Sequence, residues 1–154
     1  MEELNYHQRL KTLKMYSMER RRERYLIIYG WQQIEGKKEN VLKLKTSERS
    51  KTRRIQLGDM KYYGSDGVRI LPSVKTQIIN SPARKIERLF NCMPHYLREI
   101  KGVEVATFKR KLDEWLMRDV PDEPKCDGYA GGVAATTNSI IHQYSPGNRV
   151  SNQR

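Results

Sequence analysis

Large apolar residues recur at helical spacing in three stretches of the chain, and this pattern constrains the fold more than any other feature. Residues spaced i, i+3, i+4 and i+7 lie on one face of an α-helix, so each stripe predicts a helix with one buried side. The three stripes are Tyr6, Leu10 and Leu13; Ile86, Leu89, Phe90 and Met93; and Val105, Phe108, Leu112, Trp115 and Leu116. We therefore expect amphipathic helices over residues 3–15, 81–93 and 104–118.

Capping residues predict a fourth helix over Met18–Glu35. Ser17 can cap its first turn, and Gly36 can take the left-handed conformation that often follows a helix. The first half of this helix is rich in arginine and the second half is apolar, so we expect one charged end and one buried end. Gly30 weakens the helix by about 1 kcal/mol relative to alanine. Pro94 allows a short fifth helix to start after it.

Residues 37–80 show a different pattern, because apolar residues alternate with polar ones over short runs. Alternation with a period of two is typical of strands, and Gly64–Gly67 is a strong turn signal. The alternating pairs are Leu42 with Leu44, Ile55 with Leu57, and Val68 with Ile70. Residues 46–54 carry many charges and suggest a solvated basic loop. The fold class is thus α+β or mainly α, with four to five helices and a short, weak β-hairpin region around 41–71.

Pro121 and Pro124 interrupt helical structure, because proline lacks an amide donor and disfavours helix in the residue before it. The sequence beyond them is rich in Gly, Ser, Asn and Thr. We expect a disordered tail over 121–154, with a short helical turn at 138–143. The chain then divides into a helical hairpin (1–36), a loop with short strands (37–80), a helical segment (81–120) and the tail.

The net charge of +12, from 30 Lys and Arg against 18 Asp and Glu, lies wholly within residues 1–120. Leu, Ile, Val and Phe together number only 33 of 154 residues, which excludes a large, well-buried enzyme core. No apolar run approaches the roughly 20 residues that cross a bilayer, and the first residues are acidic, unlike a secretory signal. Two cysteines form no disulfide framework. We expect an intracellular protein, nuclear or cytoplasmic, with a polyanion as partner and no membrane contact.

Three basic clusters are candidate contacts to nucleic-acid phosphates, because arginine and lysine bind phosphate independently of base sequence. They are Arg20, Arg21, Arg22 and Arg24; Lys51, Arg53 and Arg54; and Lys109, Arg110 and Lys111. Charge runs are also commonly solvated surfaces, and that alternative stays open. Tyr25, Tyr29 and Trp31 follow the first cluster and could stack on bases, although helical spacing favours a place in the core.

No set of residues predicts catalysis, and we expect no cofactor, no metal and no small-molecule substrate. The three histidines, His7, His95 and His142, have no companions at the spacing of a metal site. Asp113 and Glu114 are neighbours on a helix, where side chains diverge by about 100°, so they do not form a paired metal site.

Three blocks of the sequence resemble the region beyond the polymerase core in non-LTR retrotransposon reverse transcriptases of the jockey/CR1-like kind. The first block is residues 4–29. The second is Leu89 to Pro94 with Leu97 and Arg98, which is similar to that family's "LFN-x-LP … LR" block. The third comprises residues 107–113, 120–124 and 128–129. Residues 58–79 depart from the family pattern.

The resemblance implies a non-catalytic, C-terminal fragment of an RNA-directed DNA polymerase. The family's Tyr-x-Asp-Asp turn and its endonuclease domain are not in this sequence, so no catalytic residue can be assigned from it. The implied function is to bind RNA or DNA phosphates in support of the polymerase core of the parent protein. Two alternatives are a protein-interaction or structural module and a non-functional remnant reading frame.

Overall fold

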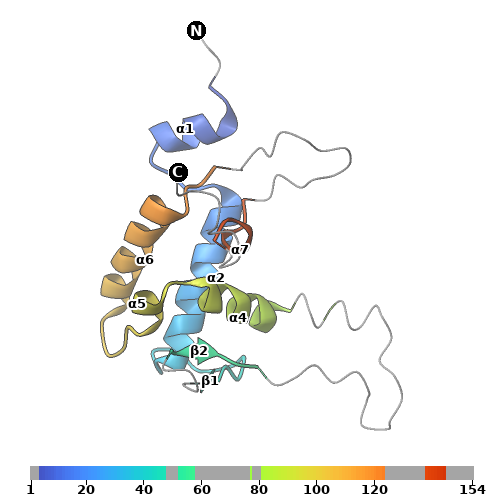
Figure 1. The fold of residues 1–154 in the computed structure, drawn as a ribbon, viewed down its shortest axis with the longest axis vertical. Coiled ribbons are helices and arrows are strands. Elements are labelled where there is room, and N and C mark those ends of the chain that lie inside the picture. The colour runs from blue at the N-terminus through green and yellow to red at the C-terminus, as the bar shows by residue number, and fades with distance from the viewer. Residues whose placement is uncertain (1–3, 48–51, 58–76, 78–80, 124–137, 145–154) are drawn as a thin grey trace, which may run out of the picture. The chain divides into compact units, whose positions relative to one another are not determined.

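The computed structural model describes residues 4–47, 52–57, 77, 81–123 and 138–144. The chain divides into two compact units. Their helices and strands are labelled in Figure 1. Unit 1 combines Met1–Tyr25 with Glu104–Arg154, and unit 2 is Leu26–Val103. The division falls within one long helix, α2 (Met18–Ile34). Unit 1 is therefore built from stretches that are far apart in the sequence.

Unit 1 contains α1 (Tyr6–Thr12), the start of α2, α6 (Val105–Asp119) and α7 (Ile140–Gln143). Helix α1 is shorter than the predicted helix over 3–15 because both its ends are fixed by local hydrogen bonds. Asn5 and Gln8 form a capping box at its start. At its end Met15 N donates to Leu10 O and Lys14 N donates to Lys11 O, the pattern of a Schellman motif.

The predicted apolar stripe of α1 is not a core face, because α1 contains no buried residue. Tyr6 and Leu13 are exposed, and Leu10 is only partly covered. The spacing predicted the helix correctly and its burial wrongly. Periodicity shows which residues share a face, and a partner for that face must come from elsewhere in the fold.

Helix α6 matches its prediction closely. Phe108, Leu112, Trp115 and Leu116 are all buried, as the stripe predicted, while Val105 is partly exposed. Within the stretch predicted as a tail, the short helix expected at 138–143 is confirmed as α7. Ile140 at its start is fully buried.

Unit 2 contains the rest of α2, the strands β1 (Thr46–Ser47) and β2 (Arg54–Ile55), α4 (Pro82–Cys92) and α5 (His95–Arg98). Ser81 caps α4 by accepting a hydrogen bond from Arg84 N, with Pro82 at the first helical position, as predicted. The buried apolar residues of this unit are Ile27, Ile28, Trp31, Leu44, Ile55, Ile86, Leu89, Phe90, Met93, Leu97 and Ile100.

The two strands pair antiparallel, with Thr46 opposite Ile55 and Ser47 opposite Arg54. Asn91 of α4 forms hydrogen bonds to the edge of β2 that faces away from β1. Its Oδ1 accepts from Ile55 N at 2.9 Å, and its Nδ2 donates to Ile55 O at 2.8 Å. This side-chain amide thus satisfies one residue of the strand edge much as another strand would.

The prediction of a strand at Leu42 and Leu44 is wrong. Lys43 between them has a φ of +53°, outside the extended region. The side chain of Asn40 holds this turn, since its Oδ1 accepts from Leu44 N at 2.8 Å and its Nδ2 donates to Leu44 O at 2.7 Å. The strands form instead at the ends of the predicted basic loop, and the region as a whole is a small hairpin.

Gly30 allows α2 to approach α4 within unit 2. A Cβ atom at this position would overlap Ile86 Cγ2. The predicted weak point of the helix is therefore a close packing contact. Gly36 follows α2 with a φ of +69°, as predicted.

The predicted fold class, α+β or mainly α with a small antiparallel hairpin, is confirmed. The predicted turn at Gly64–Gly67 and the alternation at Val68 and Ile70 lie outside the described residues.

Candidate functional site

Arg20 is buried, although its cluster was predicted to be a charged end of α2. Its Nη1 donates to Val120 O at 2.8 Å, and its Nη2 donates to Asn138 O at 3.2 Å. Burial lowers the pKa of Arg20, and the negative charge of Asp122 partly opposes that effect. Because this guanidinium is buried and bonded to backbone carbonyls of unit 1, we exclude it from a phosphate-binding surface.

Arg24 is also engaged within unit 1. Its Nε and Nη2 donate to the two carboxylate oxygens of Asp113 at 2.6 and 2.8 Å, a bidentate pair. Tyr16 donates its hydroxyl to the same carboxylate at 3.2 Å. Burial, with the charge of Asp113 second, raises the pKa of Tyr16 to about 12, so its hydroxyl stays protonated well above neutral pH.

Arg21 and Arg22 are exposed on the first half of α2. Arg21 Nε donates to Tyr16 O at 2.8 Å, whereas Arg22 points its charge to solvent. Tyr25, one turn further along, is 60% exposed. Residues three and four apart are neighbours on a helix surface, so both arginines flank this ring. Of the predicted aromatic residues, Tyr25 has the exposure that base stacking requires.

The three basic residues of α6, Lys109, Arg110 and Lys111, are exposed as predicted. Arg110 Nη1 lies 3.6 Å from Glu114 Oε1, and both side chains are more than 60% exposed. An ion pair in water is weak, so Arg110 can exchange this partner for another anion at little cost.

Arg53 is buried in unit 2, which removes it from the predicted phosphate contacts. Its Nη1 donates to Ile100 O at 3.1 Å, its Nη2 binds the carboxylate of Glu35, and its own carbonyl accepts from Arg98 Nη1 at 3.1 Å. Arg54, the next residue, is exposed because neighbours on a strand point to opposite faces. Lys51 lies outside the described residues.

Trp31 belongs to the core, the alternative that helical spacing favoured. It is fully buried, and its indole Nε1 donates to Ile100 O at 3.1 Å. Tyr29 is half-buried, with the ammonium group of Lys38 5.4 Å from its ring centre. These two rings are therefore already used within unit 2.

The positive charge is concentrated in unit 2. Its residues, 26–103, hold 16 Lys and Arg against 7 Asp and Glu, a net charge of +9 of the chain's +12. Three of its four described carboxylates bond inward, and Glu39 is exposed: Glu35 accepts from Gly102 N, Glu87 from Leu57 N and Glu99 from Arg53 N. The exposed basic residues described in this unit are Lys37, Lys38, Lys43, Lys45, Arg54, Lys85, Arg88 and Lys101.

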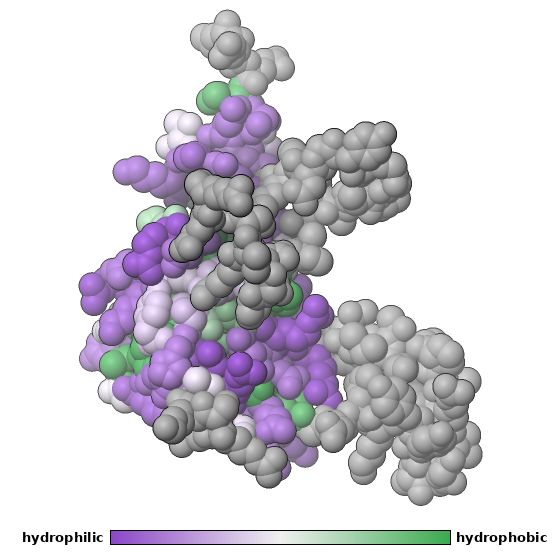
Figure 2. Space-filling model, viewed as in Figure 1, coloured by the Kyte–Doolittle hydropathy of each residue, from purple (hydrophilic) through white to green (hydrophobic). Residues whose placement is uncertain are grey.

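This surface is the candidate functional site, and the sequence identified only Arg54 of it. Lys85 and Arg88 lie three residues apart on α4, opposite its buried stripe. They do not belong to a run of three or more basic residues, so a search for such runs missed them. The sequence did contain a signal for them: the buried stripe of α4 fixes which residues of the helix face away from the core. In Figure 2 the described surface in view is mainly hydrophilic, with small separate hydrophobic areas.

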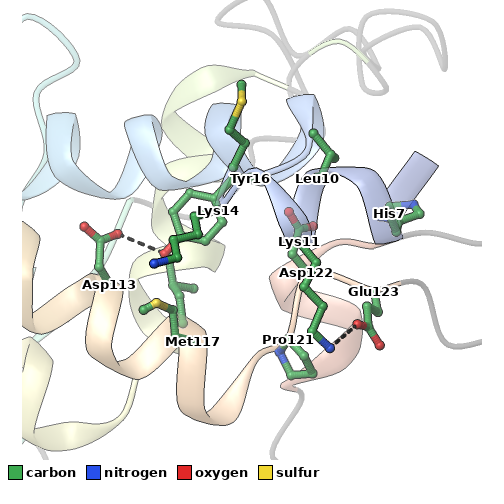
Figure 3. A pocket seen from close by; sticks show the side chains of 12 residues that line it. His7, Leu10, Lys11, Lys14, Tyr16, Asp113, Met117, Pro121, Asp122 and Glu123 are labelled. Atoms are coloured by element: carbon green, nitrogen blue, oxygen red, sulfur yellow. Dashed lines mark hydrogen bonds and ion pairs between the residues drawn. The ribbon is translucent and has the colours of Figure 1, made fainter. Parts of the chain in front are cut away.

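A pocket of about 700 Å³ lies within unit 1 between residues of α1 and α6 (Figure 3). Pockets of roughly 300–1,000 Å³ commonly bind small molecules. Its apolar lining consists of Leu10, Met15, Leu116 and Met117. His7, Lys11, Lys14, Tyr16, Asp113, Pro121, Asp122 and Glu123 complete it. This pocket could not be found from the sequence, because its two walls are about 100 positions apart.

Among the described residues, no group of three or more His, Cys, Asp or Glu side chains is placed to hold a metal ion. The described part of the chain also has no helix with the length and apolar character needed to cross a membrane. In comparisons with protein families, curated proteins and solved structures, no match to this chain was found.

Proposed function

We propose that this chain is a non-catalytic module that binds the phosphate backbone of RNA or DNA through the exposed basic residues of unit 2. The observation that carries the proposal is the net charge of +9 on residues 26–103, combined with the inward bonding of Glu35, Glu87 and Glu99. Cations then face solvent where a polyanion can displace their counterions. The proposal does not depend on the resemblance to reverse transcriptases, which stays a hypothesis about origin.

Single-stranded nucleic acid is the form that the exposed aromatic residue favours. Arg21 and Arg22 provide in unit 1 a cationic surface beside the exposed ring of Tyr25. Stacking on a base adds about 1–3 kcal/mol without selecting sequence. We expect binding that is tolerant of sequence and stronger for single strands than for duplexes.

The test is a titration of fluorescent single-stranded RNA at several salt concentrations. Replacing Arg54, Lys85 and Arg88 together by glutamine should weaken binding and reduce the slope of log K against log salt by about 2–3, as three lost phosphate contacts predict. The matched control replaces Lys109, Arg110 and Lys111, which removes the same charge from unit 1. Equal losses in both triple variants would show that net charge alone drives binding, and the proposed surface would be wrong.

A protein-interaction module is the second candidate, favoured by the exposed apolar residues of α1 and of the turn that follows it. Tyr6, Leu13 and Met15 are all exposed. If this candidate is correct, the triple variant in unit 2 leaves partner binding intact and RNA binding is absent even at low salt.

A further inference from the structure

The pocket of unit 1 has the chemistry of a site for a small amphiphile. We propose that it binds a single-chain alkyl anion, one unbranched hydrocarbon chain ending in a carboxylate or phosphate group. The apolar wall that would hold the chain is formed by Leu10 and Met15 on one side and by Met117 on the other. Methionine is flexible and polarizable, so this wall can adapt to a chain without a fixed shape.

The carboxylates that line the pocket already have partners. Asp113 binds Arg24 at 2.6 and 2.8 Å, and Glu123 binds Lys11 at 3.1 Å. Asp122 lies 4.0 Å from Arg20 Nε and accepts from Ser17 N at 2.5 Å and from Ser17 Oγ at 2.8 Å. Each acid therefore has a cation beside it and does not repel an anion as an uncompensated charge would. Asp113 and Asp122 have little acceptor capacity left for a base or a sugar, whose polar groups would lose water on entry without replacement.

Lys14 adds one positive charge to the pocket beyond those that offset the three carboxylates. It lines the pocket at the end of α1, and among the described residues its ammonium group has no hydrogen-bond or ion-pair partner. A cation at the edge of an apolar pocket complements a ligand with an apolar body and one anionic end. This charge complementarity is the reason that we commit to an alkyl anion.

The experiment measures the binding of monomeric dodecanoate to the full chain by calorimetry. Affinity should rise about fourfold for each methylene from octanoate to dodecanoate, because each buried methylene contributes about 0.8 kcal/mol. A neutral-headed dodecyl maltoside below its micelle concentration should bind more weakly. Dodecyl phosphate identifies the preferred anionic headgroup, since a higher affinity than dodecanoate points to a lipid phosphate and a lower one to a free fatty acid.

Two matched pairs of variants locate the site. Lys14→Gly should lower dodecanoate affinity about fivefold, as expected for one partly exposed ion pair. Lys43→Gly removes an equal charge at an equal φ of +53°, outside the pocket, and should leave affinity unchanged. Met117→Gln should also weaken binding, whereas Met18→Gln, at an exposed position that does not line the pocket, should not.

Three results would overturn the proposal: no dependence on chain length, equal losses in Lys14→Gly and Lys43→Gly, or displacement of dodecanoate by a nucleoside monophosphate. The last result would assign the pocket to nucleotides. Loss of RNA binding in the unit 2 variants bears on the nucleic-acid surface alone, so the two proposals fail separately.

Discussion

Glu23 caps the start of α7 across 117 positions of sequence: its Oε2 accepts a hydrogen bond from Ile140 N at 2.8 Å. The other oxygen accepts from Ser139 Oγ at 2.6 Å. A carboxylate at a helix N-terminus satisfies unpaired amide groups and interacts favourably with the helix dipole. Glu23 is almost fully buried, so the side chains around it must supply what water would otherwise provide.

Glu23→Ala should release α7 from unit 1, because Ile140 N and Ser139 Oγ both lose their acceptor. Hydrogen exchange at the Ile140 amide would then accelerate by at least tenfold. Ser139→Ala, which removes one hydrogen bond and leaves Glu23 in place, should give a smaller effect. Unchanged protection at Ile140 in Glu23→Ala would contradict this account of how α7 is held.

Arg20→Met should destabilise the chain by about 3–5 kcal/mol, because the carbonyls of Val120 and Asn138 would lose their donor and Asp122 would lose the cation 4.0 Å from it. Urea unfolding of the full chain measures the change. Arg22→Met is the matched control on the same helix, and at its exposed position we expect less than about 0.5 kcal/mol. Similar losses in the two variants would contradict the burial of Arg20.

Alkaline pH should destabilise the fold through Tyr16. Its pKa rises from 10.0 to about 12 in the folded chain, so the fold favours the protonated phenol. The resulting stabilisation is fully present below pH 10 and is lost as the pH rises from 10 towards 12. Absorbance titration should show a late step of phenol ionisation, and Tyr16→Phe should remove that step. A late step that persists in Tyr16→Phe would contradict the prediction.

Gly30→Ala should destabilise unit 2 by about 1–3 kcal/mol, although alanine is the better helix former, because its Cβ would clash with Ile86 Cγ2. Combining it with Ile86→Leu, which lacks a Cγ2 branch, should recover part of the loss. A double-mutant cycle from urea unfolding measures this coupling. Additive effects would show that the close approach is not the cause.

Lys14→Gly and Lys43→Gly should each stabilise the chain by about 0.5–1 kcal/mol, because glycine adopts a φ of +53° without the steric cost that lysine carries. Thermal or urea unfolding measures both. The alkyl-anion proposal adds that Lys14→Gly should also lower the affinity for dodecanoate, whereas Lys43→Gly should not. A loss of stability in either variant would show that the lysine side chain makes a stabilising contact.

The sequence predicted the helices well because their signals are local. Ser17, Ser81 and Gly36 mark helix ends by their own hydrogen bonds or backbone freedom, and the stripe of α6 requires one buried face. It could not predict burial of Arg20 or Arg53, because the groups that bind them come from distant positions such as Val120 and Ile100. A run of charged residues predicts an exposed surface, because the sequence does not show which distant groups can accept their hydrogen bonds in the core.

The candidate sites depended still more on distant positions. Arg54 was identified, but Lys85 and Arg88 join it only because Asn91 brings α4 against β2. The pocket could not be predicted at all, since its walls belong to opposite ends of the chain. The alternation at Leu42 and Leu44 wrongly predicted a strand. The hydrogen bonds of the Asn40 side chain hold a turn there instead.

The division of the chain within α2 implies an order in which the two units fold during synthesis. A ribosome releases residues from the N-terminus onward, and a compact unit can form once all its parts have emerged. Unit 2 is complete at residue 103, whereas unit 1 begins with the first residues and waits for α6 and α7. During that interval Arg20 and Glu23 have been made but their acceptors and donors have not. We therefore expect residues 26–103 to fold first, and the two parts of unit 1 to come together last, after α7 has been translated.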